Sequence, residues 1–467
     1  MKLNTYFDDK FSKTVWQIGK KFDLKIISVG GVVRDFLLNR EINDFDFLIL
    51  YKDDNELKNK IKPFLKDFSE NYKLNIVKPK RFETYRLVNR EMTVDFSPVE
   101  EHSLTENLLS RDLTINSIAF SFEKNEFIDP AKGILDLESR MLKTHFENNF
   151  KQDPLRILRL FRFYVYLDEF KIEEKTKSFA FKNSSLLKQT AKERVREELF
   201  KIFKNDNGFK AIREMIYPVL STLFPSFEEI KNIPQNGYHH LDVVNHTLKV
   251  VENSFNYQKF AKFFPFFSFK LNDSDKIVLR FAALFHDVGK AKTLDYDENG
   301  YTTFRNHQFE SGSIVLKELD FLPKDLLERI YLLVRRHMLF LNFMINGYSK
   351  KSFRKLINMM REDSILLVLL FLSDKDAARG PLSKGNFEKA IKVAGDFLKF
   401  YKEEKEKILN LPKLVSGYDV IKILDIAPSR EVGKVLNLIM EKQLENPDFT
   451  REEALKLIYS LKKENAK

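Results

Sequence analysis

Cysteine is absent from the 467-residue chain, and long apolar runs are absent as well. Without cysteine the protein can form no disulfide and no thiolate metal site, so a transition metal must use histidine and carboxylate ligands. No apolar run approaches the roughly 20 residues of a membrane helix, and the longest, SILLVLLFLS at 364–373, fits a buried helix. The N-terminus lacks the uninterrupted apolar segment of a signal peptide. We therefore expect a cytoplasmic protein with no membrane partner.

Positive charge is in excess, since 79 Lys and Arg face 68 Asp and Glu and give a formal net charge of +11. Such an excess favours a polyanionic partner such as nucleic acid, although a lysine-rich solvated surface would produce the same balance. The chain is also too long for one ordinary core, so about two to four domains are expected.

Strand patterns are concentrated near the N-terminus. Residues 24–120 contain the apolar runs LKIISVG, FDFLIL, KLNIVK and MTVDFSPV, with helix-like segments between the earlier ones. After about residue 145 helical periodicity dominates, and the Pro- and Gly-containing segment 224–240 marks a possible domain boundary. The fold class predicted is multidomain, with an α+β region (a mixed sheet with helices) followed by all-α regions.

Two aspartates stand two positions apart on one apolar strand. Asp44 and Asp46, in NDFDFLIL, would project from the same face. Their repulsion raises one pKa unless a cation lies between them, and a hard divalent ion such as Mg²⁺ suits such oxygen ligands. Asp95, in MTVDFSP on a later strand, could complete the site. Asp44 could instead be a turn residue.

A pair of glycines precedes these aspartates. Gly30 and Gly31 stand where a strand gives way to a helix, which lets backbone N–H groups approach a phosphate closely. Arg34, one turn into the helix, could add a charged donor. Turn-making alone would also explain the glycines.

Five motifs in order resemble those of the class II tRNA nucleotidyltransferases, which include CCA-adding, CC-adding and A-adding enzymes and bacterial poly(A) polymerases. The motifs are GGVVRDFLL followed by DFD, SRDLTINSIAF at 110–120, IDPAKGILDLESRML at 128–142, FKQDPLRILRLFRF at 150–163, and ERVREELFKIF at 193–203. They cover roughly the first half of the chain. The resemblance implies transfer of a nucleotidyl group from ATP and/or CTP to a tRNA 3′ hydroxyl, with release of pyrophosphate.

The resemblance also implies roles for individual residues. Asp44 and Asp46 would bind two Mg²⁺ ions, with Asp95 as a further catalytic carboxylate. Arg111 would hold triphosphate or ribose, and Asn116 could contact the sugar. The full set of expected nucleotide-binding residues is Gly30, Gly31, Arg34, Arg111, Asp112, Asn116, Asp153, Arg156, Arg159 and Arg162.

Asp153 and Arg156 resemble the pair with which the family reads the incoming base. An aspartate can accept from the exocyclic amine of cytosine or adenine while an arginine donates to the neighbouring ring nitrogen. Uracil and guanine present the opposite pattern, so CTP and ATP would be accepted and UTP and GTP rejected. Asp153 before Pro154 is equally a good helix start. Arg159 and Arg162 continue the series and could face nucleotide, RNA phosphate or solvent.

Two positions depart from the family pattern. Gln152 stands where a glutamate is usual, and Ser110 stands where the first arginine is common. Residues 48–84 look more like the CC-adding or A-adding branch than the usual CCA-adding enzyme. Which nucleotides are added is left open by the sequence; A addition, alone or within full CCA addition, is the expected activity.

Six of the eight histidines fall between residues 239 and 337. Imidazole and carboxylate ligands without cysteine suit Mn, Fe, Ni, Mg or a mixed pair. The order of these residues resembles the HD phosphohydrolase superfamily, a domain that some tRNA nucleotidyltransferases carry. The metal ligands implied by this resemblance are His246, His286, Asp287 and Asp374, with Asp376 as an alternative to Asp374 and with His307 and His337 as extra ligands of two-metal members. The domain would be a phosphatase or phosphodiesterase, or otherwise a structural or tRNA-binding platform.

Four regions are therefore expected: a nucleotidyltransferase head at 1–145, a nucleotide-selecting and RNA-binding helical neck at 146–235, an HD domain at 236–385, and a helical, tRNA-binding tail at 386–467. One alternative is a poly(A) polymerase with the same head. Another is a nucleotide or cyclic-phosphate hydrolase whose head is inactive. A non-catalytic tRNA-binding protein is disfavoured by the two carboxylate-rich sites.

Overall fold

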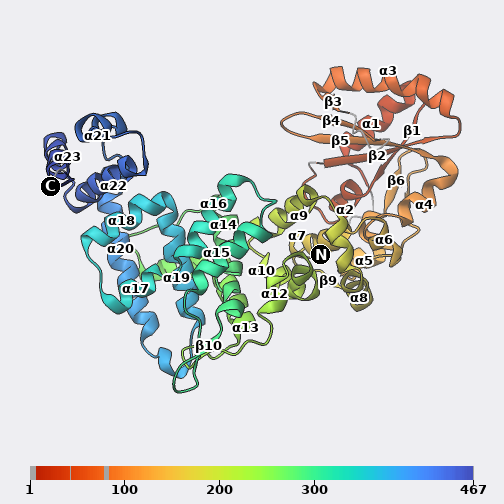
Figure 1. Ribbon diagram of the computed structural model, residues 1–467. Coiled ribbons are helices and arrows are strands. Elements are labelled where there is room, and N and C mark those ends of the chain that lie inside the picture. The colour runs from red at the N-terminus through yellow and green to blue at the C-terminus, as the bar shows by residue number, and fades with distance from the viewer. Residues whose placement is uncertain (1–6, 43, 78–83, 466–467) are drawn as a thin grey trace. The chain divides into compact units, whose positions relative to one another are not determined.

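The computed structural model describes residues 7–42, 44–77 and 84–465 (Figure 1). The chain folds as two compact units, Met1–Leu223 and Phe224–Lys467. Among the described helices, none combines the length and the apolar character that crossing a membrane would require.

A mixed seven-stranded sheet forms the centre of the first unit. Its strands are β1 (Lys25–Val29), β2 (Asp44–Tyr51), β3 (Asn75–Val77), β4 (Tyr85–Val88), β5 (Thr93–Glu100), β6 (Ala119–Ser121) and β7 (Glu126–Ile128), in the order β3-β4-β5-β2-β1-β6-β7. β2 and β5 are parallel, and the other neighbouring strands are antiparallel. The predicted mixed sheet is confirmed, and β4, β6 and β7 are strands that the sequence did not indicate.

Helices cover the sheet and continue beyond it. They are α1 (Lys10–Lys21), α2 (Gly31–Leu37), α3 (Asp54–Tyr72), α4 (Leu104–Leu109), α5 (Gly133–Glu138), α6 (Asn148–Gln152), α7 (Leu155–Tyr166), α8 (Glu174–Lys182), α9 (Lys192–Lys204), α10 (Phe209–Met215) and α11 (Ser221–Leu223), with the short strands β8 (Met141–Leu142) and β9 (Lys171–Ile172) between them. Figure 1 shows α3 lying across the sheet. Phe64 and Phe68 of α3 meet Phe96 of β5 edge to face, with ring centroids 5.0 and 5.4 Å apart. Aromatic packing therefore holds β5, and with it β2, in the centre of the unit.

α7 carries the segment in which base-selecting residues were predicted. Its buried side includes Ile157, Leu160 and Phe161, and α9 packs beside it. The helix begins at Leu155, whose N–H donates to Asp153 Oδ1 at 3.3 Å. The predicted helix start is thus found within one residue.

The second unit is almost entirely helical. Its helices are α12 (Ser226–Glu229), α13 (Val243–Phe255), α14 (Asp273–Phe285), α15 (His307–Glu318), α16 (Lys324–Arg336), α17 (Leu339–Asn346), α18 (Lys350–Met360), α19 (Ser364–Ala377), α20 (Asn386–Leu409), α21 (Gly417–Leu424), α22 (Arg430–Glu445) and α23 (Arg451–Asn465), and the strands β10 (Asp295–Tyr296) and β11 (Thr302–Thr303) form a hairpin. α13, α14 and α20 pack on α19, whose residues 366–373 are all buried. The apolar run at 364–373 is therefore a core helix, as its length predicted.

The last three helices have a core of their own. Val420 of α21, Ile439 of α22 and Ile458 of α23 are buried against one another. This cluster makes the C-terminal segment an ordered three-helix element within the second unit.

Candidate functional site

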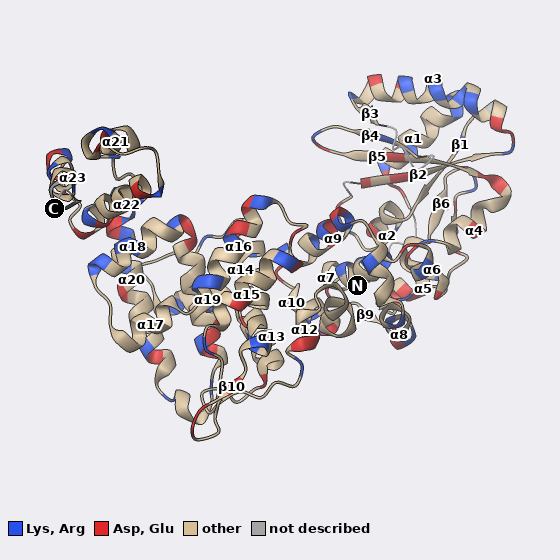
Figure 2. Cartoon of the chain, viewed as in Figure 1, with Lys and Arg blue, Asp and Glu red and all other residues tan. Residues whose placement is uncertain are grey.

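The predicted catalytic carboxylates lie side by side on the central strands. The parallel register pairs Asp46 of β2 with Asp95 of β5, so their side chains share one face, and Asp44 lies on the same face two residues away. Figure 2 shows acidic residues on these two neighbouring strands. Burial raises the pKa of Asp46, Arg111 opposes that rise, and the charges of Asp95 and Asp44 add to it. A set of neighbouring carboxylate oxygens that repel one another fits a hard divalent cation such as Mg²⁺.

Asp95 is oriented by a neighbouring strand that the sequence did not reveal. Arg86 of β4 donates to both carboxylate oxygens, from Nε to Oδ1 at 2.9 Å and from Nη2 to Oδ2 at 2.7 Å. This bidentate pair fixes the plane of the Asp95 carboxylate beside Asp46. Only the weak apolar alternation of YRLV could have indicated β4 from the sequence.

Gly30 contributes to the site by lacking a side chain, and its backbone N–H is not available to a ligand. Its φ of +74° is in a region that favours glycine, and its N–H already donates to the Ile118 carbonyl at 3.0 Å. A Cβ at this position would lie 2.8 Å from Arg111 Nη1 and 3.6 Å from Asp46 Oδ2. Both functional side chains therefore converge on the space that glycine leaves open, and Gly31 begins α2 next to it.

Arg111 is a partly buried cation beside the carboxylates. Burial lowers its pKa and the charges of Asp46 and Asp112 raise it, but a guanidinium remains protonated at neutral pH. Its Nε is buried and has no hydrogen-bond partner within the described residues. The side chain of Asn149 donates to the Arg111 carbonyl at 2.8 Å. A phosphate or another anionic ligand would supply a hydrogen-bond acceptor for this arginine.

Three other predicted nucleotide-binding residues belong to a buried polar network. Arg34 donates to both oxygens of Asp35 at 2.9 and 2.6 Å, and its Nη1 donates to Asn116 Oδ1 at 2.5 Å. Asn116 in turn donates to Asp112 Oδ1 at 2.9 Å. The phosphate-binding role of Arg34 and the sugar contact of Asn116 stay predictions, because both side chains have protein partners here.

Asp112 links this network to α7. Burial alone would raise its pKa, but Arg159, the Asn116 amide and a backbone N–H lower the pKa to about 2. The Arg159–Asp112 ion pair spans 2.7 Å. Asp112 is therefore ionised at neutral pH and ties α7 to the segment that follows α4.

The predicted base-reading pair has other partners in this structure. Asp153 Oδ2 accepts from Arg194 Nη2 at 2.9 Å, and Arg156 Nη1 donates to the Asn149 carbonyl at 3.1 Å. Arg162, nearly two turns further along α7 than Arg156, donates to Glu198 at 3.2 Å. Sequence reasoning missed these partners, although Arg194 and Glu198 both belong to the ERVREELFKIF motif. Asn149 carries no pattern that could have indicated its contact.

The second constellation is a buried cluster of histidines and carboxylates. His246 Nε2, on α13, approaches Asp374 Oδ1 of α19 at 3.0 Å, and His286 Nε2 approaches Asp287 Oδ2 at 3.1 Å. Both Nε2 atoms are buried and make no hydrogen bond within the described residues. Asp376, the alternative ligand, is instead engaged by Lys259, 2.7 Å away.

Backbone contacts define which ring nitrogens are bare. In His286, His307 and His337, Nδ1 lies 2.8, 2.8 and 2.6 Å from the carbonyl oxygen three residues earlier. A carbonyl only accepts, so Nδ1 must carry the proton, and each neutral ring then presents a bare Nε2 lone pair. Burial, together with the neighbouring histidines, lowers the pKa of His337 to about 3, which keeps this ring neutral.

The cluster offers two metal positions that share one carboxylate. One group is His246, His286 and Asp287, and the other is Asp287, His307 and His337. The Nε2 atoms of His307 and His337 face each other at 3.1 Å although neither carries a proton when the rings are neutral. Inward-facing lone pairs around a carboxylate fit divalent cations of the Mn, Fe, Ni or Mg type.

Gly289 permits the close packing that brings His307 into the cluster. A Cβ there would lie 2.4 Å from the His307 carbonyl oxygen. The glycine of HDVGK therefore lets the segment after α14 lie against the start of α15.

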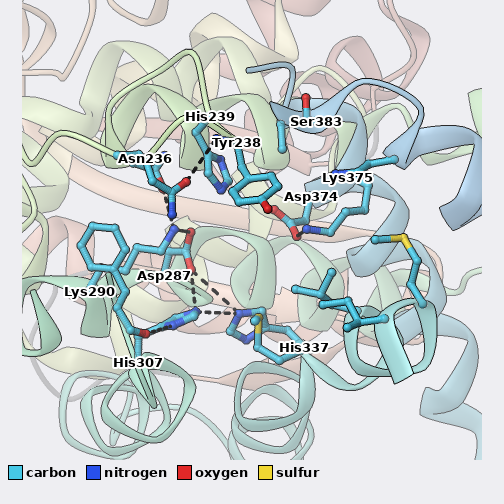
Figure 3. Close-up of a pocket in the computed structure, with 18 of the residues that line it drawn as sticks. Asn236, Tyr238, His239, Asp287, Lys290, His307, His337, Asp374, Lys375 and Ser383 are labelled. Carbon is cyan, nitrogen blue, oxygen red and sulfur yellow. Dashed lines mark hydrogen bonds and ion pairs between the residues drawn. The ribbon is translucent and has the colours of Figure 1, made fainter. Parts of the chain in front are cut away.

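A cavity of ≈540 Å³ opens onto these ligands (Figure 3). Lys290 Nζ lies 2.7 Å from Asp287 Oδ2, and Lys375 Nζ lies 2.9 Å from Asp374 Oδ2. His239 also lines the cavity, with its Nδ1 3.3 Å from the Nδ1 of His246. His239 was not among the predicted metal ligands. Its position shortly before His246 in the sequence could have indicated that it lies near the cluster.

Three segments of the chain match known protein families. Residues 26–143 match the poly A polymerase head domain, residues 169–231 the probable RNA and SrmB-binding site of polymerase A, and residues 243–379 the HD domain. The CC-adding tRNA nucleotidyltransferase of Thermus thermophilus is 32% identical over 440 residues, which cover 91% of each chain. The chain belongs to the CCA-adding family of tRNA 3′-end nucleotidyltransferases. It is a nucleotidyltransferase with an HD phosphohydrolase domain, as the motifs predicted.

Other members of this family are similar as well. The A-adding tRNA nucleotidyltransferase of Deinococcus radiodurans is 30% identical over 79% of this chain and 82% of its own. A CCA-adding enzyme solved with CTP superimposes with a TM-score of 0.62 at 22% identity, covering 97% of this chain and 96% of that one. A Thermotoga maritima CCA-adding enzyme solved with tRNA gives a TM-score of 0.59 at 20% identity, covering 98% and 96%. The predicted multidomain fold is therefore that of the family.

Proposed function

We propose that this nucleotidyltransferase adds A to tRNA ending in CC, alone or as the last step of full CCA addition. The observation that carries the proposal is the convergence of Asp46 and Arg111 beside Gly30, with Asp95 paired to Asp46 on the neighbouring strand. The similarity to an A-adding relative over 79% of the chain supports A as a product. The partners in this proposal are tRNA, ATP and CTP, in line with the relatives solved with tRNA and CTP.

The carboxylates form the reaction centre in this proposal. Asp44 and Asp46 would hold Mg²⁺, with Asp95 beside them, and the bound metal would activate the 3′ hydroxyl and stabilise charge on the α-phosphate. Arg111 would donate from its guanidinium, whose Nη1 lies beside Gly30, to a phosphate oxygen. The missing side chain of Gly30 lets Arg111 approach Asp46, and the phosphate would lie beside these two side chains.

Base selection falls to α7 in the same proposal. Asp153 would accept from the exocyclic amine of adenine or cytosine, and Arg156 would donate to the ring nitrogen. Arg194 and the Asn149 carbonyl, which these side chains contact now, would hold them in position until a base arrives. Guanine and uracil would leave both side chains facing like groups, donor to donor or acceptor to acceptor.

A second candidate is CC addition without A. The CC-adding Thermus relative covers 91% of the chain, which is more than the A-adding relative covers. A third is poly(A) synthesis, which the match to the poly A polymerase head favours.

Extension of three tRNAs separates these functions. The purified chain receives Mg²⁺, a tRNA lacking CCA, a tRNA ending in CC or a complete tRNA, and labelled ATP or CTP, and products are sized to one nucleotide. We expect one A on the CC-ending tRNA and no extension of the complete one. Addition of CC alone would establish the second candidate, and repeated addition of A to unrelated RNA would establish the third.

We also propose that the HD domain hydrolyses a phosphate ester with one or two divalent metal ions. His246, His286, Asp287 and Asp374 would bind the first ion, with His307 and His337 as ligands of a second. The metals would supply an activated water, and Lys290 and Lys375 would offset the charge of the bound phosphate. Hydrolysis of nucleotide or cyclic-phosphate substrates under Mn²⁺, Ni²⁺ or Mg²⁺ tests this role, with release of phosphate measured for monoesters and ring opening for cyclic phosphates. No hydrolysis of any of them would leave the domain a structural or tRNA-binding platform.

A further inference from the structure

One buried asparagine contacts both arginines that the transferase site is expected to use. Asn149 of α6 is 2% exposed. Its side-chain amide donates to the Arg111 carbonyl at 2.8 Å and to the Leu109 carbonyl at 3.2 Å. Its own carbonyl accepts from Arg156 Nη1 at 3.1 Å. One residue therefore joins the arginine beside the carboxylates to the arginine predicted to bind the base.

The side-chain amide of Asn149 matches the turn that carries Arg111. Leu109 is the last residue of α4, and carbonyls at a helix end lack partners within the helix. An asparagine NH₂ group has two donors, and here each donor meets one carbonyl of that turn. The amide thus fixes the backbone from which the Arg111 side chain extends.

The main-chain carbonyl of Asn149 holds the predicted base-reading pair. It lies in the last turn of α6, and besides Arg156 it accepts from the Asp153 N–H at 3.4 Å. Both members of the pair are therefore bonded to one acceptor. Because the side chain of the same residue holds the Arg111 turn, the spacing between the two parts of the site is determined at Asn149.

Asn149 is not placed to touch a nucleotide itself. Arg111, Asp153 and Arg156 are each only partly buried, so a ligand can reach them, whereas Asn149 is enclosed by protein. An effect of Asn149 on the reaction must then pass through these three residues.

We propose that Asn149 is a positioning residue for nucleotidyl transfer, and that it sets the distance between the phosphate contact at Arg111 and the base contacts at Asp153 and Arg156. The inference rests on the proposed function, from which it takes the roles of these three residues. The base and the phosphates belong to one molecule, so both ends bind well only when the protein groups are held at a matching separation.

Loss of the amide should therefore affect base selection as well as rate. Without the two donors, the Arg111 turn can shift relative to the base-reading pair. A nucleotide held by its phosphates then meets Asp153 and Arg156 out of register. The correct base loses contacts, and the penalty on a wrong base becomes smaller.

The variant N149L tests this with a side chain of similar size that has no donor. On a CC-ending tRNA, kcat/KM for ATP should fall about tenfold to a hundredfold, as expected for a small misplacement of reacting groups. The ratio of kcat/KM for ATP to that for GTP should narrow about threefold to tenfold. KM for tRNA should stay within about twofold of the wild type, because Asn149 is enclosed and cannot contact RNA.

A second variant and a matched control separate positioning from folding. N149D keeps the shape of the side chain but removes both donors, so it should narrow the same ratio. Asn183 is a buried asparagine of the same unit whose amide donates to the Phe179 carbonyl at 2.8 Å and to Glu147 at 3.2 Å. N183L loses a comparable amide away from the three nucleotide contacts, so it should lower the unfolding temperature and leave the ratio unchanged.

The ratio distinguishes the possible outcomes. A purely structural role would lower the rates with ATP and GTP by one common factor, so an unchanged ratio in N149L and N149D would overturn the inference. Equal narrowing in N183L would overturn it as well. If the wild type extends the tRNA and D153N narrows the ratio while the Asn149 variants do not, the proposed function stands and this inference alone fails. No extension by the wild type would instead sink the proposed function, and the inference with it.

Discussion

The aspartates predicted to bind metal ions lie in opposite surroundings in the two units. In the first unit Asp44 is exposed and Asp46 half-buried, with arginines from the protein as their nearest cations. In the second unit Asp287 is 2% exposed and surrounded by imidazole rings. One site is open on a sheet, and the other is enclosed among helices.

This difference follows from the size of the substrate that each proposed site has to bind. A transferase must receive a nucleotide and the end of a large RNA together, so its carboxylates stay accessible and the substrate supplies much of the metal coordination. A hydrolase of small phosphate esters can enclose its ligands, and bare imidazole lone pairs then form a metal site before any substrate binds. The two sites should therefore fail separately.

The largest expected effect is from D46N. The amide removes a charge from the predicted Mg²⁺ site, so nucleotide addition should fall at least about a thousandfold, which corresponds to about 4 kcal/mol of transition-state stabilisation. Initial rates of tRNA extension measure the loss. D168N, in the same unit, changes an exposed aspartate and should extend tRNA normally. Survival of addition in D46N would show that the carboxylates are misassigned.

D287N should have the opposite profile. Asp287 contributes to both metal positions, so its amide should abolish phosphate-ester hydrolysis and lower the Mn²⁺ or Ni²⁺ retained after dialysis, as counted by elemental analysis. D295N, on the β10–β11 hairpin, is the control. Nucleotide addition should continue at the normal rate; a matching loss of addition would contradict the independence of the sites.

D153N should alter selection more than rate. An amide can donate where the carboxylate only accepted, so the preference for ATP over GTP should narrow about tenfold to a hundredfold, in line with one lost base contact. Ratios of kcat/KM for the four nucleotides on one tRNA measure this. If the ratio of kcat/KM for ATP to that for GTP did not change, Asp153 would not contact the base.

Salt should separate the two activities. Contacts with RNA phosphates release counterions, so tRNA binding should weaken at least about tenfold between 50 and 200 mM salt. Hydrolysis of a mononucleotide in the enclosed cavity should change far less, since few charges are neutralised there. Salt titrations of both activities, run in parallel, make the comparison. If both activities fell with the same slope against salt concentration, contacts with tRNA phosphates would not be the cause of the salt dependence.

The smallest expected effect concerns stability in acid. The pKa of Asp112 is lowered to about 2 in the folded state, so its stabilisation is complete above its ordinary pKa and is lost as pH falls toward 2. The contribution is on the order of 2 kcal/mol. Urea unfolding of the wild type and D112N at pH 6 and pH 3 should give a smaller difference at pH 3. A larger difference in unfolding free energy at pH 3 than at pH 6 would contradict the lowered pKa of Asp112.

Local pattern predicted the parts of both sites that depend on spacing. Asp44 and Asp46 share a face because a strand has a period of two, and an apolar strand with two carboxylates is an unusual pattern. The expected HD ligands came from the resemblance to the HD superfamily, to which the adjacent His286 and Asp287 pointed, and their role as ligands stays a prediction. The predicted mixed sheet and helical remainder followed from the same periodicities.

Partners distant in the sequence were out of reach of such patterns. Arg86 reaches Asp95 only because β4 pairs with β5, and Arg194 reaches Asp153 only because α9 packs on α7. The cavity-lining side of α17 was equally hidden, since a run such as LFLNFMIN predicts a helix that is buried on all sides. Tertiary pairing, and not local preference, determines these contacts.

Extension of a CC-ending tRNA by the wild-type chain, with each of the four nucleoside triphosphates in turn, tests the central claim most directly. The account predicts one added A with ATP and no extension with GTP or UTP. No addition from ATP, or addition from GTP as readily as from ATP, would contradict it.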